Sequence, residues 1–148
     1  MKVYFLRHGL AGDPAQWQDD DFDRPLKDEG REKMEREARA LAKLDIALDA
    51  IITSPLVRAK QTAEIVADRL KLHNRLKEDE RLSPGFDAEQ LRLILQDHAD
   101  ADAIMLVGHE PGFSATIGHI VRAAKIDLKK GGLACVDLPD VASLDGVL

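Results

Sequence analysis

The sequence lacks several features that would indicate a membrane, secreted or nucleic-acid-binding protein. Its apolar runs are no longer than a β-strand, whereas a membrane-spanning helix needs about 20 apolar residues, and the first residues are too weakly apolar for a signal peptide. The single cysteine, Cys135, excludes an internal disulfide and favours a reducing cytoplasm. The net charge of −6, without a basic stripe, argues against nucleic acid as a partner. We therefore expect a cytoplasmic protein that binds neither membranes nor nucleic acids.

The 148 residues are enough for one domain with a substantial core, and no linker, repeat or low-complexity stretch divides them. We expect a single domain over residues 1–148. Segments typical of strands and of helices alternate along the chain, which favours an α/β fold. The sequence predicts a three-layer α/β/α sandwich with a mostly parallel central sheet. Its expected strands cover residues 3–6, 49–53, 103–107 and 134–138.

Four amphipathic helices are expected beside these strands. The first covers residues 28–44, and the second begins at Ser54-Pro55, a capping serine followed by a proline. The third begins at Asp87 with a capping box closed by Gln90, and the fourth begins near Gly112. The apolar faces expected to pack inward include Met34, Ala38, Leu41 and Ala42 in the first helix and Phe113, Ile117, Ile120, Val121 and Ala124 in the fourth.

Three of the expected strands end in residues suited to chemistry. The first strand runs into Arg7 and His8, and a later strand runs into His109. The strand at residues 49–53 leads into a helix whose first turn holds Arg58. Because open α/β sheets bind ligands at the carboxyl ends of their strands, we expect these side chains to converge. Two arginines and two histidines suit a site in which a histidine attacks a phosphoryl group.

Three motifs in this order resemble those of the histidine phosphatase superfamily, whose fold is phosphoglycerate-mutase-like. They are Leu-Arg-His-Gly at residues 6–9, Ser-Pro-Leu-Val-Arg-Ala-Lys-Gln-Thr-Ala at 54–63 and Val-Gly-His-Glu-Pro at 107–111. The small size, Asp-Arg-Pro-Leu at 23–26 and Leu-Ser-Pro at 82–84 are similar to the SixA-type phosphohistidine phosphatases within it. The resemblance extends to about residue 125 and implies a phosphatase without a metal ion or other cofactor.

The resemblance also implies a role for each residue at the strand ends. His8 would be the nucleophile, forming a covalent phosphohistidine that divides one displacement into two easier steps. Arg7 and Arg58 would bind the phosphoryl oxygens, since guanidinium groups match phosphate geometry and stay charged. His109 would be a second histidine that donates to a phosphoryl oxygen. Taken singly, three of these residues have an ordinary alternative. Either histidine could be a structural core residue, and Arg58 could form a surface ion pair.

Gly9 and Arg24 are the expected substrate-binding residues beside this set. By analogy with the SixA-type pattern Arg24 contributes a third cation, and a surface salt bridge with Asp20 or Asp23 is the alternative. The acidic run at residues 19–21 is expected to be a solvated loop, because three adjacent carboxylates cannot converge on one divalent ion.

The mutases and sugar phosphatases of the superfamily resemble each other in having a glutamate that acts as a general acid. This chain departs from that pattern, because it has Pro84 at the corresponding position. An alkoxide leaving group needs such an acid, which is worth about 10²–10⁴ in rate. A phosphohistidine can instead be protonated on its other ring nitrogen by solvent, so the departure favours P–N cleavage. Glu80 and Asp87 could substitute as the acid, although surface positions flanking helices explain both. Lys27 is a second departure, because the SixA-type pattern often has a threonine cap there.

The sequence therefore predicts a metal-independent phosphatase that removes phosphate from a histidine of a partner protein of the histidine-containing phosphotransfer type. The short chain shows no inserted cap, which suggests an open site suited to a protein surface. A small-molecule phosphomonoesterase of the same superfamily, with Glu80 or Asp87 as acid, remains open. So does a non-catalytic domain that binds phosphate. His73, His98 and His119 lack metal-ligand spacing.

Overall fold

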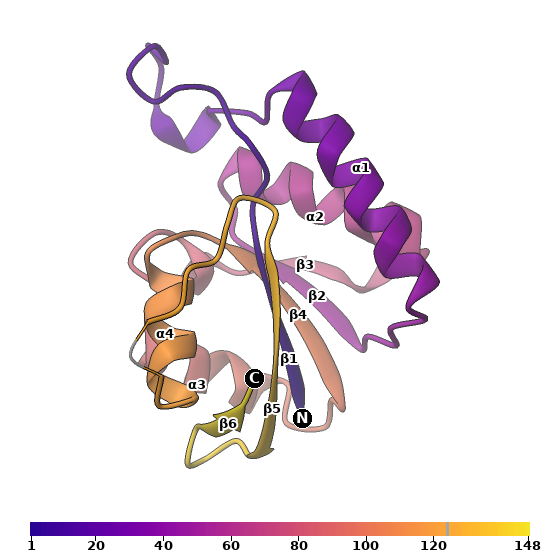
Figure 1. The fold of residues 1–148 in the computed structure, drawn as a ribbon, viewed down its shortest axis with the longest axis vertical. Helices are drawn as coiled ribbons and strands as arrows, with labels where there is room; N and C mark the ends of the chain where they lie inside the picture. The colour runs from indigo at the N-terminus through magenta and orange to yellow at the C-terminus, as the bar shows by residue number, and fades with distance from the viewer. Residues whose placement is uncertain (124) are drawn as a thin grey trace.

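A computed structural model describes residues 1–123 and 125–148. They form one six-stranded sheet in the order β3-β2-β4-β1-β5-β6 (Figure 1). Strands β1 to β4 are parallel to one another, whereas β5 and β6 are antiparallel to their neighbours. The prediction of a mostly parallel sheet is confirmed. The strands are β1 (Lys2–Arg7), β2 (Ala50–Thr53), β3 (Leu76–Glu78), β4 (Ala103–Gly108), β5 (Leu133–Asp140) and β6 (Asp145–Val147).

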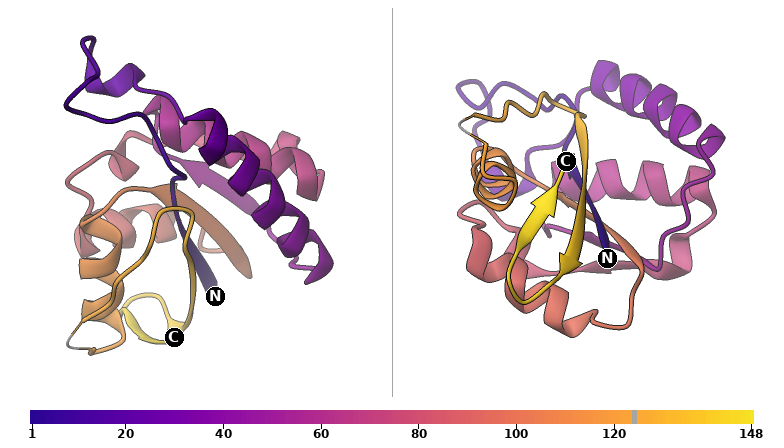
Figure 2. Two further views of the ribbon diagram at one scale, coloured as in Figure 1. Left: turned by 45° about the horizontal axis from the view of Figure 1, so that its top comes forward. Right: turned by 60° about the horizontal axis from the view of Figure 1, so that its bottom comes forward.

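Helices cover both faces of the sheet, which confirms the predicted α/β/α layers (Figures 1 and 2). Helices α1 (Asp28–Lys43) and α2 (Val57–Leu70) pack on one face, against Leu6 among others. Helices α3 (Ala88–Asp97) and α4 (Gly112–Ile120) pack on the other, against Phe5. Successive strand residues point to opposite faces, so β1 contributes to both halves of the core. Within residues 1–123 and 125–148, none of the helices has the length and hydropathy needed to cross a bilayer.

The starts of the helices agree with the sequence in one case and differ in another. The capping box of α3 is present: the Asp87 carboxylate accepts from the Gln90 amide at 3.1 Å, and the Gln90 side chain accepts from the Asp87 amide at 3.2 Å. Helix α2 begins at Val57 and not at Ser54-Pro55. The Ser54 hydroxyl contacts a histidine ring and accepts from the Leu56 amide at 3.3 Å, but it caps no amide inside the helix. The predicted start of α2 was therefore two residues too early, because Leu56 and not Ser54 precedes the first helical residue.

Smaller differences occur at the edges of the fold. Ala42 is exposed, because the buried face of α1 ends at Leu41 and its last turn extends into solvent. Ala124, expected on the apolar face of α4, lies outside the described residues. Strand β3 was not expected, since three residues are too few to show a period. The tail after β5 forms the short edge strand β6, which is antiparallel to β5.

Candidate active site

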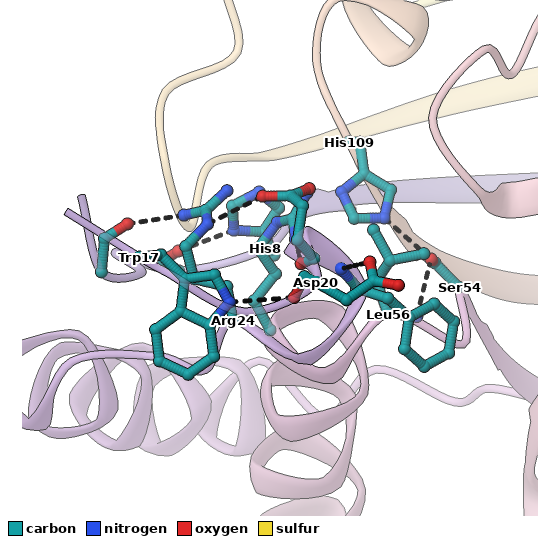
Figure 3. Close-up of polar contacts among 12 residues, drawn as sticks. His8, Trp17, Asp20, Arg24, Ser54, Leu56 and His109 are labelled. Carbon is teal, nitrogen blue, oxygen red and sulfur yellow. Dashed lines mark hydrogen bonds and ion pairs between the residues drawn. The ribbon is translucent and has the colours of Figure 1, made fainter. Parts of the chain in front are cut away.

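The carboxyl ends of three adjacent parallel strands bring the expected residues together. In the β1–β4 register Arg7 lies opposite Gly108, so His8 and His109 emerge side by side, with ring centroids 5.2 Å apart. Strand β2 flanks β4 on the other side, and the Ser54 amide donates to the Val107 carbonyl at 2.9 Å. This places Ser54 beside His109 (Figure 3). The convergence that the sequence predicts follows from this parallel register.

A cavity of about 520 Å³ opens at this edge of the sheet. Its lining includes Arg7, His8, Arg58 and His109, the four residues expected to act on a phosphoryl group, and also Arg24. Guanidinium groups and imidazoles are suitable donors for an oxyanion. Among the residues that the structure describes, no three His, Cys, Asp or Glu side chains are grouped so that they could hold a metal ion. The donors of the cavity are those of an anion site.

The ring of His8 is held in one tautomer. Its Nδ1 lies 2.7 Å from the carbonyl oxygen of Gly9, and because a carbonyl can only accept, Nδ1 carries the hydrogen. In the neutral ring the lone pair is then on Nε2, which is free to attack. Burial lowers the pKa of His8 to about 4, and the charges of Arg58 and Arg7 act in the same direction against the Gly9 hydrogen bond. The imidazole is therefore neutral at pH 7, as a nucleophile must be.

His109 is buried and bound through one nitrogen only. Its Nε2 lies 2.7 Å from the Ser54 hydroxyl, whereas its Nδ1 is buried without a hydrogen-bond partner among the described residues. Figure 3 shows the unpartnered nitrogen on the side of the ring that faces His8. Burial lowers the pKa of His109 to about 3, with smaller contributions from His8 and Arg58. If the Ser54 hydroxyl donates to Nε2, the proton of the neutral ring sits on Nδ1, which can donate to an anion.

The two buried arginines share one carboxylate, that of Asp21. Arg58 donates to its Oδ2 at 3.0 Å and to its main-chain oxygen at 2.9 Å, and Arg24 donates to its Oδ1 at 2.9 Å. The partner of Arg24 is thus neither Asp20 nor Asp23, because the short helical turn at Asp21–Asp23 presents the carboxylate three residues before the arginine. The hydrogen bond from Arg24, more than the nearby charges, lowers the pKa of Asp21. The acidic run is therefore not simply a solvated loop.

The indole of Trp17 makes a hydrogen bond within the same loop. Its Nε1 donates to the main-chain oxygen of Asp20 at 2.9 Å (Figure 3). This bond spans three residues and stabilises the chain directly before the turn that carries Asp21. The loop therefore presents its carboxylate to the arginines with support from its own hydrogen bonds.

Arg7 and Gly9 are held by neighbouring segments. Arg7 donates from Nη1 to the Leu128 carbonyl at 3.0 Å, which orients its guanidinium in the cavity wall. Gly9 is not part of the cavity lining: its amide donates to the Thr62 hydroxyl at 3.1 Å, and a Cβ there would lie 2.7 Å from the Met34 side chain. Gly9 thus anchors the turn that carries His8, and the structure does not bring it to the place expected of a substrate contact.

Neither expected acid reaches the cavity. Asp87 is used as the cap of α3, and Glu80 is exposed on a short helical turn at Glu80–Leu82. Neither belongs to the lining, whereas Pro84 does. The carboxylates that do line it are Asp13, Asp21 and Glu110.

Asp21 and Ser54 are the site residues that sequence reasoning missed. Ser54 stands in the second family motif, but it was interpreted as a helix cap. The spacing of three residues between Asp21 and Arg24 was the available signal for the first.

Comparison with known proteins agrees with the geometry. Residues 3–83 match the model of the histidine phosphatase superfamily (branch 1). An uncharacterized protein of Picosynechococcus sp. is 36% identical over 138 residues, covering 90% of this chain and 82% of its own length. The phosphohistidine phosphatase SixA of Escherichia coli is 28% identical over 123 residues, covering 82% of this chain and 72% of its own length.

The fold is also similar to that in a solved structure of the protein histidine phosphatase SixA complexed with tungstate. The TM-score is 0.87 at 24% identity, with 99% of this chain and 93% of the other covered. The family match and the architecture together support phosphatase activity. The chain therefore belongs to branch 1 of the histidine phosphatase superfamily, with SixA-type proteins among its relatives.

Proposed function

We propose that this protein is a phosphohistidine phosphatase, which removes phosphate from a histidine of a partner protein through a covalent intermediate on His8. The state of His8 carries the proposal. Its Nδ1 is held by the Gly9 carbonyl at 2.7 Å and its pKa is lowered to about 4, so Nε2 offers a lone pair at neutral pH. A nucleophile of this kind, set among arginines, suits phosphoryl transfer by positioning and charge stabilisation.

In the first step, a bond forms between His8 Nε2 and phosphorus while the P–N bond of the substrate breaks. The electron pair returns to the substrate imidazole, whose other nitrogen already carries a proton from solvent, so the leaving group departs neutral. Arg7 and Arg58 would stabilise the charge on the phosphoryl oxygens, and one such arginine can be worth about 10³–10⁵ in rate. Nδ1 of His109 would donate to a phosphoryl oxygen.

In the second step, water attacks the phosphorus of the phosphorylated His8. The P–Nε2 bond breaks, its electron pair returns to the ring, and both protons of the water leave with the phosphate. No metal ion is needed in this scheme, because the arginines supply the positive charge. The cycle restores the neutral imidazole, whose protonated Nδ1 donates to the Gly9 carbonyl.

The position of the carboxylates supports P–N over P–O cleavage. An alkoxide needs a positioned acid, but Pro84 lines the cavity and neither Glu80 nor Asp87 does. The three carboxylates in the lining are already engaged in other contacts. Asp21 is bound by two arginines, Asp13 accepts from the Ala15 amide at 2.9 Å, and Glu110 accepts from the Ser114 amide at 2.9 Å. A protonated phosphohistidine leaves without such help. The name of the Escherichia coli relative points to the same substrate class.

Intact-mass spectrometry after brief mixing with a phosphohistidine peptide, quenched at alkaline pH, tests the nucleophile. We expect one phosphoryl adduct on the wild-type protein, none on His8→Ala, and phosphate release at longer times. His119→Ala is the matched control, since His119 is exposed on α4 and outside the cavity. An adduct that persists on His8→Ala would refute His8 as the nucleophile.

Substrate competition separates the remaining functions. The proposal expects kcat/KM to be higher for a phosphohistidine peptide than for sugar or nucleotide monophosphates. The opposite order would favour a small-molecule phosphomonoesterase. Phosphate binding that depends on Arg7 and Arg58, without turnover of any substrate, would indicate a non-catalytic domain.

A further inference from the structure

Two lysines of the cavity have no function in the chemistry described above. Lys27 and Lys130 both line it, and both are exposed at its rim. Within the part of the chain that the structure describes, the lysines that form ion pairs are Lys33, Lys60 and Lys129. Lys27 and Lys130 therefore present ammonium groups that no carboxylate of the described residues neutralises.

The backbone of Lys27 is held close to the nucleophile. Its amide donates to the Leu10 carbonyl at 3.0 Å, and its own carbonyl accepts from the Arg31 amide at 2.9 Å in the first turn of α1. Leu10 is two residues beyond His8 and also lines the cavity. The side chain of Lys27 thus starts from a defined point on the rim of the site.

The backbone around Lys130 is tied to the strand that carries the nucleophile. The amide of Gly131 donates to the carbonyls of Arg7 and His8, each at 3.1 Å, and the Arg7 amide donates to Gly132 at 3.0 Å. Figure 1 shows the segment before β5 passing over the end of β1. Lys130 therefore belongs to a segment held directly beside His8.

The cavity has more cationic than anionic side chains, so it can bind a second negative group beside a phosphoryl group. Five cationic side chains line it against three carboxylates, in a chain whose net charge is −6. The carboxylates already accept hydrogen bonds: Asp13 from the Ala15 amide, and Asp21 and Glu110 as described above. A phosphoryl group would engage the arginines, whose planar forks match its oxygens. The lysines are left to meet a different anion beside it.

Resting on the phosphohistidine phosphatase function proposed above, we propose that Lys27 and Lys130 select substrates in which acidic residues flank the phosphohistidine. An ammonium group is a point charge on a flexible stem, so it tolerates carboxylates at somewhat variable positions on a partner surface. At an exposed rim such contacts act mainly on encounter and specificity, and salt screens them. The preferred partner is a protein with an acidic surface around its phosphorylated histidine.

Two phosphohistidine peptides test this preference, one with acidic and one with neutral flanking residues but otherwise identical. We expect wild-type kcat/KM at low ionic strength to be about tenfold higher for the acidic peptide, and the ratio to fall at high salt. In the double variant Lys27→Gln and Lys130→Gln the ratio falls to about twofold or less. Lys43→Gln is the matched control, about 24 Å along α1 from Lys27, and should keep the wild-type ratio.

The outcomes separate this inference from the function on which it rests. Equal wild-type turnover of both peptides, or a preference that survives in the double variant, overturns the role of the lysines while leaving the phosphatase function intact. Failure to hydrolyse either peptide overturns the proposed function and this inference with it. A lysine-dependent preference confined to bisphosphorylated small molecules would also overturn the acidic-partner proposal.

Discussion

The two buried histidines predict that the protein loses stability on mild acidification. His8 and His109 are 8% and 4% exposed, and burial lowers their pKa values to about 4 and about 3. In the unfolded chain a histidine has a pKa of about 6.5. As the pH falls below that value, the unfolded state binds protons that the folded state does not. The stabilisation that comes from keeping both rings neutral is fully present above about pH 6.5. It is lost as the pH falls toward the folded pKa values, about 4 for His8 and about 3 for His109.

The size of the loss follows from the two pKa values. At about pH 5 the unfolded histidines are almost fully protonated and the folded ones are mostly neutral, so each contributes a loss of about 2 kcal/mol. The summed loss of about 4 kcal/mol is a large part of the free energy of unfolding of a typical domain, which is about 5–15 kcal/mol. Carboxylates with lowered pKa values, such as Asp21 and Asp79, lose their contribution only below about pH 3.9. Glu37, whose pKa burial raises, opposes the loss.

Urea denaturation followed by circular dichroism at about pH 7, 6 and 5 measures this dependence. His8→Asn is expected to remove about half of the loss, because one buried titrating ring is gone. His119→Asn is the control and should reproduce the wild-type dependence, since that side chain is exposed on α4. A wild-type free energy of unfolding that changes by less than about 1 kcal/mol between pH 7 and pH 5 would refute the assignment of two neutral buried rings.

Two further substitutions test contacts around the site, each through the free energy of unfolding. Asp21→Asn should cost about 1–2 kcal/mol, because Arg58 stays buried after its counterion is removed, while the carboxylate itself is largely exposed. Asp23→Asn should cost nothing measurable, and equal stability of the two variants would contradict the role of Asp21. Gly30→Ala should cost about 2–3 kcal/mol despite the better helix propensity of alanine, because the new Cβ would lie 2.1 Å from the Leu10 carbonyl oxygen. Wild-type stability of that variant would show that the turn at Leu10 can move away.

The order of the layers and the convergence of the site could be predicted from the sequence. Strand β4 is an uninterrupted apolar run, which is typical of a strand covered on both faces, and it lies inside the sheet between β2 and β1. The charged residues that follow such strands converge wherever the strands are parallel neighbours. Arg7, His8 and His109 met for that reason, and the family resemblance indicated the chemistry.

Contacts between side chains distant in sequence could not be predicted in this way. Asp21 is 37 residues from Arg58, and Ser54 is 55 residues from His109. Whether either pair meets depends on the path of a loop and the register of the sheet. The sequence therefore predicted a solvated Asp21 and a helix-capping Ser54, because capping and ligand-spacing patterns involve only residues that are close in the chain.

The sequence by itself determined the layered α/β architecture, the strands that carry the site and the residue types available for chemistry. These properties depend on hydrophobic periodicity and on short motifs, which are local. Only the tertiary structure decided which nitrogen of His8 is free, which carboxylate binds the arginines, and that Glu80 and Asp87 lie outside the cavity. Those properties depend on burial and on distances of a few ångströms between separate segments, and packing of the whole chain sets both.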